Sequence, residues 1–308
     1  MAGDASVWHD GELRPASEVQ MGMLTHTLHY GFGLFEGIRA YQQADGSSAV
    51  FRLREHVDRM IGGAKILRLA LPFDRDQLAR ACVDTLVANG LREAYLRPLA
   101  YIGEGKMGIY APQNPVHVGV AAWEWGAYLG EDGLRKGIRC KVSSFTRTHV
   151  NTQMVRAKVT GGYVTSILAK SEAAADGYDE AILLDQDGYC AEGSGENLFC
   201  VRDGVLFTPP LAAPILAGIT RDAILTLARE QGVEVREERF SRDDLYLADE
   251  AFFTGTAAEV TPIREVDGRP VGTGSPGPVT CELQASFFRV LRGEEPAHAA
   301  WRTVYKVS

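Results

Sequence analysis

The sequence predicts an α/β (α+β) protein of two domains, with the functional site in the cleft between them. Its 308 residues are enough for two ordinary domains. Short β-like runs alternate with segments whose apolar residues recur at helical spacing. This pattern lapses into glycine and charge at 126–136, which we interpret as a linker between a smaller N-terminal domain, 1–125, and a larger C-terminal domain, 137–308. Ligands commonly bind where two domains meet.

Local patterns predict the elements of the first half. "VWHDGELRP" (7–15) places Asp-Gly between two β-like runs, which is typical of a hairpin. Residues 49–71 and 74–90 carry apolar side chains at helical spacing, and the second segment ends in Asn-Gly, a helix stop. "EAYLRPLAYIG" (93–103) and "PVHVGVAAWEW" (115–125) predict strands.

The second half alternates in the same way. "IRCKVSSF" (138–145) predicts a strand, and 161–176 predicts a helix. Residues 180–210 predict several strands joined by Asp-Gly turns. "GITRDAILTLAREQG" (218–232) predicts a helix with an acid in its first turn and glycine at its end. A strand region at 250–268 and a closing helix at 281–293 complete the expected order.

Composition excludes several classes of protein. The formal net charge of −8 argues against a nucleic-acid surface, which requires a basic patch. The five cysteines are widely spaced and contain no C-x-x-C pair, so they indicate buried thiols in a reducing compartment. The start "MAGDASVWHDGELRP" does not resemble a secretory signal, and no apolar run is long enough to span a bilayer. We therefore expect a cytoplasmic protein without a metal site, a nucleic-acid partner or a membrane partner.

Lys158 stands out because the glycines of "VRAKVTGGYVTSILAK" (155–170) follow it closely. Glycines let backbone pack near the lysine, and desolvation would make its amine able to form an imine with an aldehyde. The alternative is a loop lysine with a packed stem and a solvated head.

Glu192 lies in "AEGSGENLF" (191–199), inside a segment whose other residues are suited to an interior. A carboxylate is seldom buried without a cationic partner. A protonated heteroaromatic nitrogen would serve as that partner, and so would an ordinary arginine.

Two further stretches could bind anions. In "LAGITRD" (216–222), Gly218 and Thr220 stand at a helix start, where free N–H groups and the helix dipole attract negative charge. "TGTAAE" (254–259) is a turn of small residues with exposed amides. Arg59 could add a charge-assisted contact. A lysine, an acid and a phosphate cradle together are what pyridoxal 5'-phosphate requires.

At these residues the chain resembles the branched-chain amino acid aminotransferases, which are fold-type IV pyridoxal-phosphate enzymes. The likeness covers nearly the whole chain and includes "HYGFGLFEGIRAY" (29–41), "EHVDRM" (55–60), "AYLRPL" (94–99), "WGAYLG" (125–130), "AEGSGENLF" (191–199), "FTPP" (207–210), "GITRDAI" (218–224), "LYLADEAFFTGTAAEVTPI" (245–263) and "GPVT" (277–280).

The resemblance implies a role for each matching residue. Lys158 would bind the cofactor covalently and carry a proton, Glu192 would pair with the ring nitrogen, and Tyr163 would bond the ring oxygen. Residues expected to bind the phosphate are Arg59, Ile219, Thr220 and Thr256. Those expected to bind the substrate are Tyr30, Phe35, Tyr95, Arg97, Trp125, Tyr128, Thr256 and Ala257.

Arg97 addresses a difficulty of the implied reaction. The enzyme would transfer amino groups between L-leucine, L-isoleucine or L-valine and 2-oxoglutarate by a ping-pong route, so one pocket must accept both apolar side chains and that of glutamate. A buried carboxylate without a partner costs several kcal/mol. The resemblance implies that Arg97 pairs with this carboxylate when glutamate is bound.

The resemblance also implies an assembly. "GKMGIY" (105–110) is similar to a loop that reaches the neighbouring subunit's site in this family. We expect at least a homodimer, and bacterial relatives are often hexamers.

The chain departs from the family pattern at Glu124, where relatives often have proline, and at Phe145 and Val150, where many have tryptophan and proline. These positions bear on the ranking of substrates.

Two other interpretations stay open at this point. Within the same fold, a D-amino acid aminotransferase or an aminodeoxychorismate lyase would use a different carboxylate-binding pattern. A small-molecule-binding or assembly protein could have kept the scaffold without catalysis, although the joint presence of Lys158, Glu192 and Tyr163 argues against this.

Overall fold

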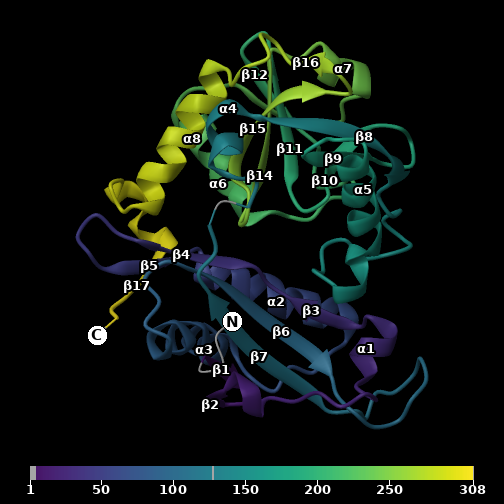
Figure 1. Cartoon of the computed structure of the whole chain (residues 1–308), viewed down its shortest axis with the longest axis vertical. Coiled ribbons are helices and arrows are strands. Elements are labelled where there is room, and N and C mark those ends of the chain that lie inside the picture. The colour runs from purple at the N-terminus through teal and green to yellow at the C-terminus, as the bar shows by residue number, and fades with distance from the viewer. Residues whose placement is uncertain (1–4, 127, 308) are drawn as a thin grey trace. The chain divides into compact units, whose positions relative to one another are not determined.

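The computed structural model describes residues 5–126 and 128–307 and confirms a mixed α/β fold (Figure 1). The chain forms two compact units. Unit 1 consists of Met1–Trp125, Ala157–Gly162 and Val290–Ser308, and unit 2 consists of Gly126–Arg156 and Tyr163–Arg289.

This division differs from the expected domains at two segments. Ala157–Gly162, with Lys158, belongs to unit 1 rather than to the C-terminal part, because Val159 forms a β-bridge to Leu34 and Gly161 N–H donates to Gly31 O at 2.8 Å. The C-terminal strand joins unit 1 because it pairs with Ser48–Phe51. Residue 127 of the expected linker, like 1–4 and 308 of the two expected domains, lies outside the described residues. The rest of the linker contains a short helix, α4 (Glu131–Lys136).

Unit 1 is built on an eight-stranded sheet, as far as its residues are described. The strand order is β17-β5-β4-β6-β7-β1-β2, with β3 paired to β6. These strands are β1 (Ser6–His9), β2 (Glu12–Pro15), β3 (Gly33–Phe35), β4 (Ile38–Gln42), β5 (Ser48–Phe51), β6 (Ala94–Ile102), β7 (Val116–Trp123) and β17 (Arg302–Tyr305). Its helical segments are η1 (Ala16–Glu18), α1 (His26–Tyr30), α2 (Leu53–Leu67), α3 (Arg75–Ala88) and η3 (Pro296–Trp301).

The core of unit 1 lies between its sheet and helices α2 and α3. Apolar side chains at helical spacing, among them Val57, Met60 and Leu78, pack against strand residues such as Ile38 and Leu96. The expected helix at 49–71 is wrong at its start, since 49–51 belong to β5. All four residues of β5 are buried between β4 and β17, and such a short apolar run has no period that separates strand from helix.

Unit 2 holds a nine-stranded sheet in the described residues, in the order β10-β9-β8-β15-β14-β11-β12-β13, with β16 paired to β15. Its strands are β8 (Ile138–Thr146), β9 (Glu180–Leu184), β10 (Cys190–Gly193), β11 (Asn197–Arg202), β12 (Val205–Thr208), β13 (Val235–Glu237), β14 (Glu250–Gly255), β15 (Glu259–Val266) and β16 (Arg269–Pro270). Its helices are α4, α5 (Val164–Ala175), α6 (Ile219–Glu230) and α7 (Arg242–Tyr246). Two helical segments, η2 (Thr160–Tyr163) and α8 (Pro278–Leu291), cross the boundary between the units along the chain.

Side-chain and backbone chemistry begins several of these elements. The expected Asp-Gly hairpin is confirmed, with Asp10 and Gly11 at φ +47° and +101° in the turn between β1 and β2. Asp74 and Gln77 form a capping box at the start of α3. None of the described helices combines the length and apolar character that crossing a membrane requires.

Candidate functional site

The predicted site residues divide between the two units. Unit 1 holds Tyr30, Phe35, Arg59, Tyr95, Arg97, Trp125 and Lys158, and unit 2 holds Tyr128, Tyr163, Glu192, Ile219, Thr220, Thr256 and Ala257.

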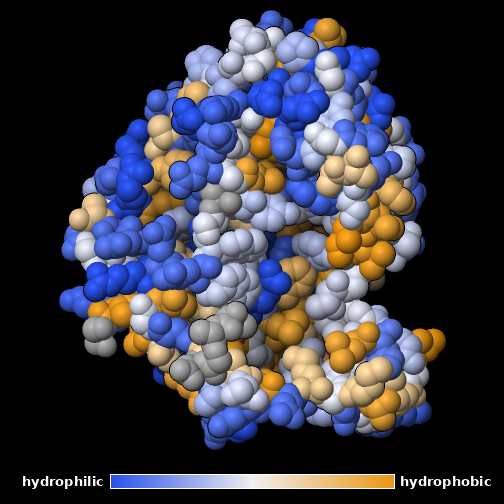
Figure 2. Space-filling model, in the orientation of Figure 1, coloured by the Kyte–Doolittle hydropathy of each residue, from blue (hydrophilic) through white to orange (hydrophobic). Residues whose placement is uncertain are grey.

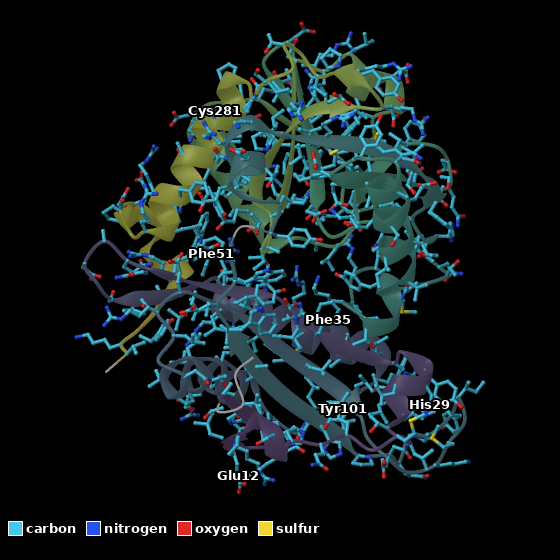
Figure 3. The ribbon with its side chains drawn as sticks, viewed as in Figure 1. Glu12, His29, Phe35, Phe51, Tyr101 and Cys281 are labelled. Carbon is cyan, nitrogen blue, oxygen red and sulfur yellow. The ribbon has the colours of Figure 1, made fainter. Side chains whose placement is uncertain are left out.

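Lys158 lies on an extended segment beside β3. Phe35 N–H donates to Lys158 O at 3.1 Å, and the Lys158 Nζ lies 4.9 Å from the centroid of the Phe35 ring (Figure 3). The nearby glycines have a packing reason, because a Cβ on Gly31 would lie 2.7 Å from Gly161 Cα. Close backbone contact therefore fixes the chain three residues after the lysine.

An arginine shares the same aromatic ring. The Arg97 Cζ lies 4.8 Å from the Phe35 centroid, and its Nη2 donates to Tyr95 Oη at 3.1 Å. Tyr95 and Arg97 are two residues apart on β6, so they project to the same face of the sheet. The Arg97 Nε is buried and has no hydrogen-bond partner among the described residues, so this guanidinium keeps donor capacity for an anion.

The aromatic residues around Arg97 are grouped as expected, with two exceptions. The ring of Trp125 lies 4.5 Å from that of Tyr95 in an edge-on arrangement. Tyr30 is exposed on α1, its ring 4.5 Å from that of His26. Tyr128 belongs to unit 2, where its ring lies 5.7 Å from Lys170 Nζ. The structure therefore brings Phe35, Tyr95, Arg97 and Trp125 together with Lys158, while Tyr30 and Tyr128 have other neighbours.

Arg59 is held in place by a buried carboxylate. Its Nε and Nη2 donate to the two oxygens of Glu36 at 2.8 and 2.7 Å, and His56 Nδ1 lies 2.8 Å from Glu36 Oε2. Burial favours the neutral acid, but the charge and hydrogen bonds of Arg59, with His56, outweigh it and lower the pKa of Glu36 to about 2. Burial likewise lowers the pKa of His56. The bidentate pair fixes the guanidinium of Arg59.

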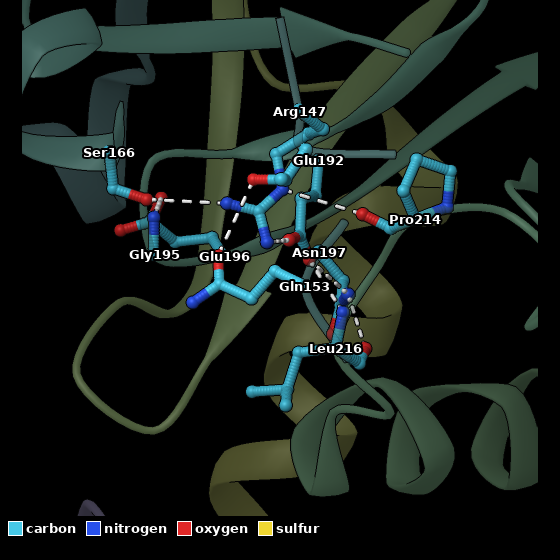
Figure 4. A network of polar contacts seen from close by, with 10 residues as sticks. Arg147, Gln153, Ser166, Glu192, Gly195, Glu196, Asn197, Pro214 and Leu216 are labelled. Atoms are coloured by element: carbon cyan, nitrogen blue, oxygen red, sulfur yellow. Dashed lines mark hydrogen bonds and ion pairs between the residues drawn. The ribbon is translucent and has the colours of Figure 1, made fainter. Parts of the chain in front are cut away.

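In unit 2, Glu192 is the centre of a polar network (Figure 4). Arg147 Nη2 lies 2.8 Å from Glu192 Oε1, while Asn197 Nδ2 and Leu216 N–H donate to Oε2 at 3.2 and 3.1 Å. Glu192 is only 6% exposed. The arginine partner considered as the ordinary alternative is therefore present, and it keeps the carboxylate charged and oriented.

Glu192 belongs to a row of polar residues across the sheet. It is paired across the strands with Asn197, which is paired in turn with Thr254, so all three side chains project from one face. The Thr254 Oγ1 is buried and lacks a hydrogen-bond partner among the described residues. An unsatisfied hydroxyl of this kind is typical of a site built for a polar ligand.

The start of α6 meets this row. Gly218 caps the helix, and a Cβ there would lie 1.9 Å from Asn197 Oδ1, so only glycine fits. Ile219 and Thr220 are buried in the first turn, whose N–H groups have no partners within the helix. Thr256 and Ala257 are half-buried in the turn that follows Thr254. Row, helix start and turn together form an anion-binding set of donors.

A second buried acid lies close along the chain. Burial, followed by the neighbouring Glu180 carboxylate, raises the pKa of Glu196 to about 8. Its Oε2 accepts from Gly195 N–H at 3.0 Å, and Lys170 Nζ pairs with Glu180 at 2.8 Å. Glu196 is therefore neutral at pH 7.

The sequence interpretation missed several of these partners. Arg147 and Asn197 orient Glu192, and Glu36 and His56 orient Arg59, yet none of them was predicted as a site residue. Glu36 and Asn197 lie in motifs that were quoted for the resemblance, and a buried acid inside "LFEGIR" was the available signal.

The profile of the family described as amino-transferase class IV matches residues 33–266. The chain belongs to this family. Relatives of this class IV aminotransferase include the branched-chain-amino-acid aminotransferase of Pseudomonas aeruginosa, 52% identical over 98% of both chains, and that of Escherichia coli K12, 48% identical over 96% of both.

Solved structures of similar chains give the same result. The structure of the Escherichia coli branched-chain amino acid aminotransferase has a TM-score of 0.95 and 47% identity, covering 97% of this chain and 98% of that one. A thermophile's branched-chain amino acid aminotransferase, solved with pyridoxamine 5'-phosphate, has a TM-score of 0.93 and 46% identity over 97% and 98%. The fold of this class IV aminotransferase is thus that of the fold-type IV aminotransferases.

Proposed function

We propose that the chain is a branched-chain amino acid transaminase, which transfers the amino group between L-leucine, L-isoleucine or L-valine and 2-oxoglutarate. The observation that carries this proposal is the 52% identity over 98% of both chains with an enzyme of that name. The side chains that the reaction needs are present, including Lys158, Glu192, Arg97 and Arg59. The D-amino acid and lyase alternatives have weaker support, because the similar proteins named above are branched-chain enzymes.

The proposed cofactor is pyridoxal 5'-phosphate, since one similar branched-chain amino acid aminotransferase was solved with pyridoxamine 5'-phosphate and also with N-(5'-phosphopyridoxyl)-L-glutamate. The residues of this chain fit such a group. Thr254 Oγ1 is an unsatisfied buried donor, Gly218 leaves no Cβ at the start of α6, and Glu192 is a buried carboxylate held by three donors. When bound, the cofactor supplies a ring that accepts electrons from the substrate's α-carbon.

In this proposal each residue has one task at the cofactor. Lys158 binds it covalently through Nζ and then moves a proton from the substrate's α-carbon. Glu192, kept charged by Arg147, accepts a hydrogen bond from the protonated ring nitrogen, and Tyr163 bonds the ring oxygen. The phosphate is bound by Arg59, by the first-turn N–H groups of Ile219 and Thr220, and by Thr256.

The substrate is recognised at both of its ends. Tyr95 and the amides of Thr256 and Ala257 would bind the α-carboxylate. Phe35, Tyr30, Trp125 and Tyr128 would contact an apolar side chain, and Arg97 would pair with the side chain of glutamate. The aromatic ring that Lys158 and Arg97 share supports a site that is apolar and yet charge-tolerant.

We further propose a homodimer or a larger homo-oligomer, with 105–110 contributing to the neighbouring site. Large apolar side chains are exposed in this loop, with Ile109 and Tyr110 91% and 77% exposed. Figure 2 shows apolar surface near α1, where Leu28 is 63% exposed. Apolar exposure on this scale marks a surface that another chain covers. A cytoplasmic location stays a prediction.

Absorbance spectroscopy tests the cofactor and its lysine together. The purified protein should absorb visible light, and borohydride treatment or the Lys158→Ala substitution should abolish that band. A Lys158→Ala variant with the full spectrum and full activity would disprove the assignment of the lysine.

A further inference from the structure

A cluster of metal-binding side chains lies in unit 1, apart from every residue assigned above. His9 ends β1, Asp10 follows in the hairpin turn, and His117 lies on β7. One ligand atom from each of the three lies within 4.8 Å of the others. Asp10 Oδ2 is 2.5 Å from His117 Nδ1 and 3.7 Å from His9 Nδ1.

Neighbouring groups hold these side chains in position. His9 Nε2 lies 2.8 Å from Tyr101 Oη, and Val118 N–H donates to Asp10 Oδ1 at 2.9 Å. The His117 ring occupies space beside Gly103, since a Cβ there would lie 2.5 Å from His117 Nε2. Figure 3 labels Tyr101 within this part of unit 1. A ring nitrogen that donates to a neighbouring oxygen leaves the other nitrogen with its lone pair for a metal, and such second partners are usual around metal-bound histidines.

We propose that His9, Asp10 and His117 bind one zinc ion. Two imidazoles and one carboxylate form a donor set that zinc prefers, and the partial exposure of the three side chains leaves water to complete the coordination. The ion would take the place of the proton now shared by Asp10 and His117. The neighbouring cation Arg14 is itself paired with Glu12 at 2.6 Å, which reduces its repulsion of the ion.

The site would join the β1–β2 hairpin to β7. Residues on these two strands are already paired, His9 with Gly119 and Trp8 with Val120, so a bound ion would cross-link side chains on strands in register. Its expected role is structural, because no residue of the proposed catalytic set lies among the three ligands.

Calorimetric titration of the tag-free holoenzyme with ZnCl₂ tests the proposal. We expect one zinc ion per chain at this site, a higher melting temperature with zinc, and no comparable binding of Mg²⁺, which requires oxygen ligands. Asp10→Asn and His117→Ala should each remove this binding event. Asn tolerates the positive φ of position 10 and can still accept from Val118 N–H, so Asp10→Asn should fold normally. His149→Ala, in unit 2, is the matched control and should bind zinc as the wild type does.

A conservative variant separates metal binding from a merely structural cluster. Tyr101→Phe removes the hydroxyl beside His9 and should weaken zinc binding by about 10- to 100-fold with little change in the metal-free melting temperature. Diffraction at the zinc absorption edge from soaked crystals should place the ion between the three side chains. The proposal is overturned if the zinc stoichiometry and affinity of Asp10→Asn and His117→Ala equal those of the wild type, or if the anomalous peak lies elsewhere.

Discussion

Arg97 is the residue on which the proposed dual specificity depends. Replacing it with alanine should leave the side-chain carboxylate of glutamate without a partner while hardly affecting leucine. Loss of one member of such a charge pair costs about 2 kcal/mol or more, so kcat/KM for glutamate should fall roughly 30-fold or more. Steady-state kinetics with both amino acids provides the measurement.

The comparison of the two substrates is the control in this experiment. Arg97→Lys keeps the charge but not the planar fork, so its loss for glutamate should be intermediate. Equal losses for leucine and glutamate would show that Arg97 has a structural role only.

Glu36 makes the stability of the protein depend on acid. Its pKa of about 2, lowered from 4.5, means that the ion pair with Arg59 contributes fully above pH 4.5 and is lost as the pH falls towards 2. Glu36→Gln should therefore lower the free energy of unfolding by on the order of 3 kcal/mol at pH 7. The difference from wild type should shrink as the pH is lowered towards 3.

Urea unfolding between pH 3 and pH 7 measures this dependence. Glu12→Gln alters an exposed carboxylate and should change the unfolding free energy by less than about 0.5 kcal/mol throughout. A Glu36→Gln defect that did not vary with pH would contradict the assignment of the ion pair.

The start of helix α6 depends on a single glycine. An added Cβ at Gly218 would lie 1.9 Å from Asn197 Oδ1, so Gly218→Ala must displace either the helix start or the asparagine that holds Glu192. We expect a loss of about 1–3 kcal/mol in the free energy of unfolding, together with weaker retention of the cofactor.

Helix α2 offers a matched control for this change. Gly62 is exposed within the helix and has nothing within 4 Å of an added Cβ, so Gly62→Ala should stabilise the protein by up to about 1 kcal/mol. Thermal melting and cofactor dialysis of both variants provide the comparison. A Gly218→Ala protein as stable as Gly62→Ala would mean that the helix start is not constrained in this way.

Elements with a clear period were predictable, whereas short ones were not. Helices α3 and α6 and strands β6 and β7 match their expected positions, because each carries a sustained apolar pattern with recognisable ends. β5 was missed because four consecutive buried residues show no period.

Partners brought together by distant segments were also beyond the sequence. Arg147 lies 45 positions before Glu192 in the chain, and nothing in its own neighbourhood marks it as that residue's partner. The place of Ala157–Gly162 in unit 1 likewise depends on contacts with Gly31 and Leu34, more than 120 positions earlier. The motifs could supply the residue types of the site, but the tertiary fold decides which side chains orient them.

The whole molecule carries apolar surface that a second chain would cover. On α5, Val164, Ile167 and Leu168 are 61, 62 and 45% exposed at helical spacing, while Ala169 and Ala173 face the core of unit 2. Ile167→Asp combined with Leu168→Asp should shift the oligomer towards monomer, because burying two charges in an apolar interface is costly. Analytical ultracentrifugation gives the measurement.

Val87→Asp serves as the control, since this side chain is 40% exposed on α3 of unit 1. It should leave the oligomer unchanged. A wild-type protein that sediments as a monomer, or a double variant that remains fully assembled, would contradict the proposed use of α5 as an interface.

Turnover of a panel of L- and D-amino acids with 2-oxoglutarate, by the wild type and by Lys158→Ala, tests the central claim most directly. We predict that the wild type uses L-leucine, L-isoleucine and L-valine well and D-amino acids poorly, and that Lys158→Ala loses activity with every substrate. Preference for D-amino acids, or a fully active Lys158→Ala variant, would contradict the account.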